Sequence, residues 1–221
     1  MNPTQRTVGI LLFEGFELLD VFGPVELLSR LPERYRLLYF APAVGPVRSG
    51  QGVQVVATHS FQDAPDVGIV LVPGGPGTRA LVHDAGFLAS LRGWASRSPL
   101  VTSVCIGSAL LAAAGLLEGY RATSNKRAFA WASSQGEAVE WVAQARWVQD
   151  RDRWTSSGVA AGMDMTAALI RELDGEEEAE RAAQEIELEI HRAAEWDPFA
   201  ALNGLNGLNG EATSEMPHIP E

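Results

Sequence analysis

Short, almost wholly apolar runs recur along the chain and alternate with longer stretches of helical periodicity. Such runs lack polar alternation, so they are typical of strands covered on both faces in a parallel sheet. Pro24 suits the first turn of one of the predicted helices, and Pro32 marks its end. The alternation predicts an α/β fold, with a mostly parallel sheet and helices on both of its faces. The predicted strands are residues 7–13, 35–41, 67–72 and 100–104, and the predicted helices are 21–31, 85–97 and 158–173.

Two hairpins and an acidic helix complete the main predicted elements. The hairpins cover residues 47–58, with a turn around Ser49-Gly50-Gln51-Gly52, and residues 146–156. Residues 176–194 carry apolar side chains at helical spacing and open with three glutamates, which favour the positive end of a helix. A docking role for this acidic run is less common than a solvated helix face, which we adopt.

The end of the chain differs from the rest in composition. Three copies of Leu-Asn-Gly occupy residues 202–210, and few apolar residues follow them. Because Asn-Gly pairs form turns and the segment has little to bury, it is predicted to be a flexible tail. The expected organisation is therefore one α/β domain over residues 1–200 and a tail over 201–221.

Charge and cysteine content limit the partners and the compartment. Seventeen basic and 28 acidic residues give a net charge of −11, which repels nucleic-acid phosphates and anionic membrane surfaces. The uncharged run 100–117 reaches the lower length limit for a membrane span, but its polar and glycine residues favour a buried strand and helix. One cysteine excludes an intrachain disulfide framework, and no secretory leader pattern opens the sequence. We expect a cytoplasmic protein without nucleic-acid or membrane partners.

Cys105 lies where a predicted strand meets a predicted helix. The small residues Gly107 and Ser108 follow it and permit a sharp turn, which is the layout of a nucleophile elbow. A thiol at this turn would lie over the helix N-terminus, whose N–H groups stabilise a thiolate and lower the pKa. The alternative is a buried structural cysteine, which this spacing alone leaves equally open.

Three loops follow predicted strands and are expected to meet at one edge of the sheet: residues 14–20, 73–77 and 105–108. Gly74 and Gly75 tolerate unusual dihedral angles and add no side chain. Their N–H groups and that of Ile106 are therefore candidates for an oxyanion hole. A plain tight turn is the alternative for residues 73–77.

Carboxylates are the best candidates for acid–base chemistry beside the cysteine. None of the four histidines follows the Cys105 helix within reach of this edge, and no cluster has metal-ligand spacing. Glu17 and Asp20 come just after the first predicted strand, and Asp20 is favoured as the general acid/base. The alternative for Asp20 is a helix N-cap.

Four motifs, covering about the first 200 residues, identify the chain as similar to the ThiJ/PfpI superfamily, which is related to the class I glutamine amidotransferase fold. Within it, the chain most resembles the isonitrile hydratase branch and the amidotransferase-like domains of AraC-type regulators. Those regulators carry a C-terminal DNA-binding module, and no helix-turn-helix is predicted after Leu173. The motifs are GILLFEGFELLDVFGPVELL, VLVPGG, VTSVCIGSALLAAAGLLEGYRAT and TSSGVAAGMDMTAALIREL.

The resemblance implies a flavodoxin-like three-layer α/β sandwich, usually a homodimer. It also implies a lyase that hydrates a small isonitrile without cofactor or metal. The Cys105 thiolate would attack the isonitrile carbon, Asp20 would handle protons, and water would release an N-substituted formamide. The non-enzymatic alternative is a redox- or electrophile-sensing or ligand-binding domain related to the regulators.

Two positions depart from the pattern of the branch. Ile106 replaces a small hydroxyl residue and narrows the pocket, and Asn125 stands where a histidine is common. Asn125 can hydrogen-bond a ligand but cannot act as a base, which disfavours protease or glyoxalase chemistry. Glu17 and Asn125 are therefore retained as possible substrate contacts, and the departures favour a different substrate, or a reduced or absent activity.

Overall fold

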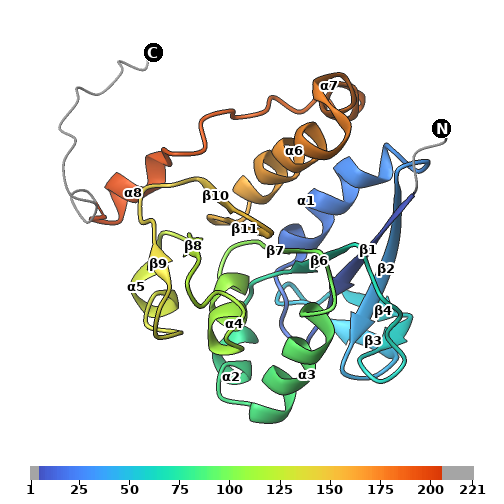
Figure 1. Cartoon of the computed structure of the whole chain (residues 1–221), viewed down its shortest axis with the longest axis vertical. Helices are drawn as coiled ribbons and strands as arrows, with labels where there is room; N and C mark the ends of the chain where they lie inside the picture. The colour runs from blue at the N-terminus through green and yellow to red at the C-terminus, as the bar shows by residue number, and fades with distance from the viewer. Residues whose placement is uncertain (1–4, 206–221) are drawn as a thin grey trace.

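A computed structural model describes residues 5–205 and contains a seven-stranded sheet with helices on both sides (Figure 1). The elements are β1 (Arg6–Leu11), α1 (Leu18–Ser29), β2 (Tyr35–Ala41), β3 (Gly45–Arg48), β4 (Gln54–Ala57), β5 (His59–Ser60), β6 (Ile69–Val72), α2 (Thr78–Leu81), α3 (Ala85–Ala95), β7 (Leu100–Ser103), α4 (Gly107–Ala113), β8 (Arg121–Ala122), α5 (Phe129–Ala132), β9 (Glu140–Trp141), β10 (Trp147–Asp150), β11 (Arg153–Ser156), α6 (Ala161–Asp174), α7 (Glu176–Glu185) and α8 (Pro198–Leu202).

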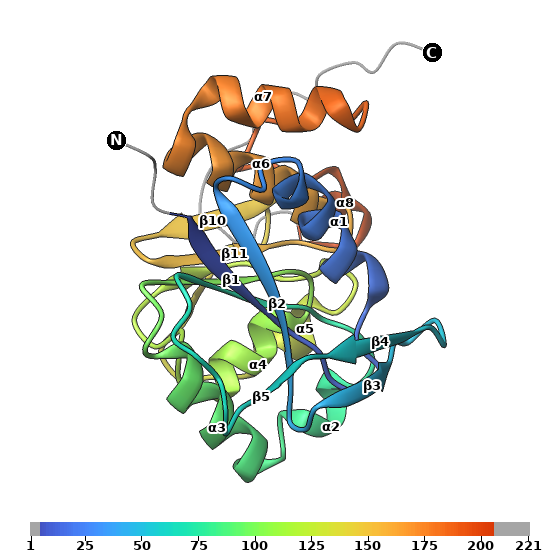
Figure 2. The ribbon, with the colours of Figure 1, turned by 90° about the vertical axis from the view of Figure 1, so that its right-hand side faces the viewer.

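The central sheet has the strand order β10-β11-β7-β6-β1-β2-β5. All neighbouring strands run parallel except β10 and β11, which form the predicted hairpin. Every residue of β6 is buried, as its continuous apolar run predicts. Helices α1, α6 and α7 lie on one side of the sheet and α2, α3 and α4 on the other (Figure 2). The predicted mostly parallel, flavodoxin-like α/β fold is confirmed.

The first helix begins earlier than predicted. It starts at Leu18 rather than Val21, so Pro24 lies inside it and not in its first turn. The backbone N–H of Leu18 donates to the side-chain oxygen of Gln51, 3.0 Å away, so the β3–β4 turn completes this helix end. Because Leu18 and Gln51 are far apart in sequence, no local sequence pattern could have predicted this start of the helix.

The acidic helix is shorter than predicted. It ends at Glu185, and Glu187 has a φ of 54°, which breaks the helical path. The following segment hydrogen-bonds elsewhere: the His191 N–H donates to Asp164 and the Arg146 N–H donates to the Ala194 carbonyl. These tertiary hydrogen bonds replace those of a continued helix, so the apolar periodicity after Glu185 was misleading.

The start of the predicted tail lies within the described residues, and residues 206–221 lie outside them. Helix α8 extends to Leu202, and its N-cap Asp197 accepts a hydrogen bond from the Phe199 N–H. Leu205 is buried with Phe129 and Ala200 in a small apolar cluster. The chain thus packs against the domain at least as far as Leu205.

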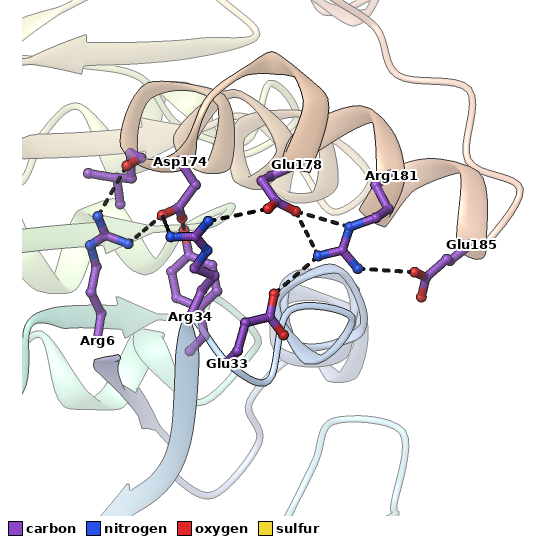
Figure 3. A network of polar contacts seen from close by, with 9 residues as sticks. Arg6, Glu33, Arg34, Asp174, Glu178, Arg181 and Glu185 are labelled. Atoms are coloured by element: carbon purple, nitrogen blue, oxygen red, sulfur yellow. Dashed lines mark hydrogen bonds and ion pairs between the residues drawn. The ribbon is translucent and has the colours of Figure 1, made fainter. Parts of the chain in front are cut away.

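A network of arginines and carboxylates lies at the end of the sheet where β1 and β2 begin (Figure 3). Its buried centre is Asp174, which accepts from Arg6 Nη1 at 2.8 Å and from the Tyr35 hydroxyl, with Arg34 Nη1 at 3.9 Å. Burial and the Asp174 carboxylate raise the pKa of Tyr35. Outer members extend the network along α7, and they are Glu33, Glu178, Arg181 and Glu185.

Candidate active site

Cys105 occupies a strained turn between β7 and α4. Its φ of 59° is left-handed, a conformation that costs energy for a residue with a side chain. A Cβ at Gly107 would lie 2.3 Å from the Val72 carbonyl oxygen, so only glycine fits two residues after the cysteine. This strand–turn–helix geometry is that of the predicted nucleophile elbow.

Three serines hold the backbone of Cys105. Its N–H donates to the Ser157 carbonyl at 3.0 Å, and its own carbonyl accepts from Ser108 and Ser124, at 3.2 and 3.1 Å. All three serines are buried. Ser124 and Ser157 were not predicted as part of the site, because nothing in their local sequence shows that these segments meet the elbow.

Asp20 lies beside Cys105 at the carboxyl end of β1. It is the third residue of α1 and is fully buried, while Glu17 occupies the N-cap position, so the N-cap interpretation of Asp20 is wrong. Its Oδ2 accepts the Gly74 N–H at 2.8 Å. A Cβ on Gly74 would lie 3.0 Å from both Asp20 Oδ2 and Cys105 Cβ, which places the two groups on either side of this glycine.

The Asp20 carboxyl lacks a cation. No lysine, arginine or histidine within residues 5–205 pairs with it, and its buried Oδ1 has no hydrogen-bond partner there. Burial, and to a lesser extent the negative charge of Glu17, raise its pKa to about 7, against the lowering effects of the Gly74 N–H and the Cys105 thiol. Asp20 can therefore take up or release a proton near neutral pH, as a general acid/base requires.

The prediction of a lowered pKa at Cys105 is wrong. Burial raises the pKa of this thiol, and the Asp20 carboxylate raises it further. Hydrogen bonds from the Ile106 N–H and the Asn125 side chain lower it but do not compensate. Desolvation and a neighbouring negative charge outweigh the local donors, so the ground state holds a neutral thiol.

One of the three N–H groups predicted to form the oxyanion hole, that of Gly74, has another role. The Gly74 N–H already donates to Asp20, so it is not free for a ligand. Gly75 adopts a φ of 118°, and a Cβ there would lie 2.4 Å from the Glu17 nitrogen, so this position needs glycine. The Ile106 N–H points to the Cys105 sulfur and is available where charge develops during a reaction at that atom.

Glu17 and Asn125 also approach the elbow. The Glu17 N–H donates to the Gly74 carbonyl at 2.8 Å, and its charge raises the pKa of both Asp20 and Cys105. The Asn125 side chain hydrogen-bonds to Cys105, and its Oδ1 accepts the Ala128 N–H at 3.2 Å. Gly158 leaves the room for this amide, because a Cβ there would lie 2.3 Å from Asn125 Nδ2.

The site is enclosed. Cys105 and Ile106 are 7% and 8% exposed, whereas Glu17 and Asn125 are half-buried and lie at the border of the site. A cavity of about 570 Å³ lies instead along β10 and α6, and none of its lining residues belongs to the site. A substrate of Cys105 is therefore expected to be small.

Within residues 5–205, no group of three or more histidine, cysteine or acidic side chains is arranged to hold a metal ion. None of the helices in this range combines the length and the apolar character needed to cross a bilayer.

Comparison with known proteins defines the family. Residues 6–172 match the model of the DJ-1/PfpI family, which is most of the chain. The chain belongs to the DJ-1/PfpI family. The predicted resemblance to ThiJ/PfpI proteins is thereby confirmed.

Several DJ-1/PfpI relatives are similar in sequence or structure. Isonitrile hydratase of Pseudomonas putida is 36% identical over 180 residues, covering 81% of this chain and 77% of that protein. The HTH-type transcriptional regulator GbdR of Pseudomonas aeruginosa is 32% identical over 183 residues, covering 80% of this chain but only 49% of the regulator. A crystal structure of a ThiJ/PfpI family protein from Pseudomonas syringae has a TM-score of 0.78 at 33% identity, covering 86% of this chain and 78% of that one.

Proposed function

We propose that this DJ-1/PfpI protein is a cofactor-free lyase that hydrates a small isonitrile to an N-substituted formamide. The observation that carries the proposal is the buried Asp20 carboxyl, unpaired with any described cation and next to the elbow cysteine. The similarity to an isonitrile hydratase over 81% of the chain supports the same reaction class. Cys105 is the nucleophile and Asp20 the general acid/base.

The raised pKa values of Asp20 and Cys105 support one order of proton transfers. The ionised form of Asp20 accepts the thiol proton while the sulfur attacks the terminal isonitrile carbon, so no stable thiolate is needed. The S–C bond forms, and Asp20 delivers the proton to the same carbon, which gives a thioimidate. Water then adds to this carbon, the C–S bond breaks, and the formamide leaves with its N–H while Cys105 regains its proton.

The residues that depart from the branch have compatible roles. The Asn125 amide and the Ile106 N–H are donors to the sulfur and offset part of the charge that develops there. Ile106 is a buried apolar residue next to Cys105, which favours a compact, apolar isonitrile substituent over a polar one. A small-molecule substrate and a homodimeric assembly remain our expectations for the solution state, the latter to be tested by analytical ultracentrifugation.

The test is hydration of a small alkyl isonitrile, with the formamide measured by chromatography. We expect turnover by the unmodified protein, loss of turnover in Cys105→Ala, and unchanged turnover in Asp66→Asn, an exposed carboxylate at the opposite end of β6. Formamide formation that persists in Cys105→Ala would contradict the assigned nucleophile.

The similarity to GbdR supports a second candidate, a ligand-binding or electrophile-sensing domain. The raised pKa of Cys105 argues against fast peroxide sensing, because oxidation follows thiolate character. Saturable binding of a small molecule without any chemical turnover would favour this candidate.

A further inference from the structure

The β3–β4 hairpin projects from the domain (Figure 2). Backbone hydrogen bonds attach its turn to the loop that carries Glu17. The Gly15 N–H donates to the Arg48 carbonyl at 2.8 Å, and the Gly50 N–H donates to the Phe16 carbonyl at 2.7 Å. Phe16 and Ser49 form an isolated parallel bridge between the two segments. The hairpin is therefore attached directly to one of the three loops of the site.

Gln51, at the tip of this turn, uses both ends of its amide on the start of α1. Its Nε2 donates to Glu17 Oε1 at 2.6 Å, and its Oε1 accepts the Leu18 N–H at 3.0 Å. The side chain of the N-cap residue Glu17 does not cap the helix, so Gln51 supplies the missing acceptor from another element. One side chain thus holds both the Glu17 carboxylate and the helix end.

These contacts lead to Asp20 by a short path. Asp20 lies two residues after Leu18 in the same helical turn, and the Glu17 N–H is bonded to the carbonyl of Gly74, whose own N–H binds Asp20. The charged groups around this path are Glu17 itself, Glu14 and Arg48 on the docked segments; Glu14 accepts the Arg48 N–H at 3.3 Å. Within residues 5–205, Glu17 forms no ion pair, so an amide donor is what holds its charge near the site.

We propose that Gln51 is a positioning residue, which acts through Glu17 and the first turn of α1 to set the place and charge environment of Asp20 beside Cys105. It is not a catalytic residue, because it contacts neither the thiol nor Asp20. The proposal rests on the proposed function only for the part that Asp20 plays in turnover. The positioning itself can be measured without a substrate.

The test follows the pH titration of the Asp20 carboxyl carbon by NMR in protein labelled with ¹³C-aspartate, with the signal assigned by its loss in Asp20→Asn. Gln51→Ala frees Glu17 to move into water, so we expect the titration midpoint to fall by about 0.5 pH unit. Gln51→Glu adds a negative charge beside Glu17, so the midpoint is expected to rise by about the same amount. A loss of packing alone would not produce shifts of opposite sign.

Gln54 provides the matched control, because it is an exposed glutamine on the same hairpin whose side chain makes no hydrogen bond in the described part of the chain. Gln54→Ala and Gln54→Glu are expected to leave the midpoint within 0.1 unit of the unmodified protein, about the precision of such a titration. Equal shifts from the Gln51 and Gln54 variants, or no shift from either Gln51 variant, would overturn the proposal.

Turnover separates this proposal from the proposed function. If the protein hydrates isonitriles, both Gln51 variants should lower kcat about threefold to tenfold with little change in KM, since the substrate contacts remain. If no isonitrile is hydrated but the two Gln51 variants shift the Asp20 titration in opposite directions, the positioning role stands and the proposed function fails.

Discussion

Asp20 and Asp174 are two buried carboxylates at opposite ends of the same sheet, and their surroundings differ in one respect. Asp174 meets Arg6, Arg34 and the Tyr35 hydroxyl where β1 and β2 begin. Asp20 lies where β1 has ended, and among residues 5–205 it meets only neutral donors, a negative charge and a thiol. The paired carboxylate joins α6 to the sheet, whereas the unpaired one retains a proton that it can exchange near neutral pH.

The difference has a free-energy cost at the Asp20 end. A carboxyl with a folded-state pKa of about 7 and an unfolded-state pKa near 3.8 binds its proton more tightly when folded. The free energy of unfolding therefore falls as pH rises from the unfolded towards the folded pKa. A buried carboxyl that lowers stability in this way, and that packing does not require, is typical of a functional residue.

The largest expected effect is on turnover. Asp20→Asn keeps the shape and the bond from Gly74 but cannot accept the thiol proton, so kcat for isonitrile hydration should fall by about 1,000-fold. Asp174→Asn, measured at a temperature where it is folded, should retain turnover within about twofold. Similar losses from both variants would break the distinction between the two ends of the sheet.

The second effect is on the pH dependence of stability. Between pH 5 and pH 8, the free energy of unfolding should fall by about 3 kcal/mol more in the unmodified protein than in Asp20→Asn, as measured by urea unfolding. The reason is that only the carboxyl must give up its proton in the buried site. Subtracting the variant removes the contribution of the other titrating groups. Parallel pH profiles for the two proteins would show that Asp20 ionises as freely in the folded state as in the unfolded chain.

A third effect concerns the paired carboxylate. Asp174→Asn should lower the free energy of unfolding by about 2 kcal/mol at pH 7, because Arg6 and Arg34 lose their shared buried partner. Thermal and urea unfolding measure this loss, and Tyr35→Phe separates the part due to the hydroxyl. A variant as stable as the unmodified protein would mean that the pair only offsets its own desolvation.

The smallest effect is expected at the outer edge of the same network. Arg181 is 42% exposed in its side chain and pairs with Glu33, Glu178 and Glu185 (Figure 3). Because water and salt screen such pairs, Arg181→Ala should change the free energy of unfolding by less than about 0.5 kcal/mol. A loss as large as that of Asp174→Asn would show that the outer pairs act together with the buried centre.

Much of the fold was predictable because burial leaves a local trace in sequence. A parallel strand covered on both faces is apolar throughout, so the run 67–72 predicted the strand β6, every residue of which is buried. The helix predicted over residues 176–194 ends at Glu185. Ile190 still packs against the core, but it does so from a non-helical segment, which is held by hydrogen bonds of the His191 N–H and the Ala194 carbonyl. Periodicity records which side chains are buried, and it does not record which backbone hydrogen bonds replace a helix.

The site was predictable to the extent that strand ends define it. Cys105, Asp20 and Gly74 follow three parallel strands, and parallel strands place such loops at one edge. Gln51, Ser124 and Ser157 were not predictable, since each acts through hydrogen bonds to a segment distant in sequence. No residue pattern encodes a contact of that kind.

The sequence by itself determined the α/β order, the elbow at Cys105 and the loop that brings Asp20 to it, because apolar runs, glycines and strand ends are local properties. Only the tertiary structure decided the direction of the Cys105 pKa and the use of the Gly74 N–H. Both depend on how deeply Asp20 and Cys105 are buried together and on which charges share that space. Desolvation and charge coupling depend on all the groups that surround a residue, and those groups come together only in the folded protein.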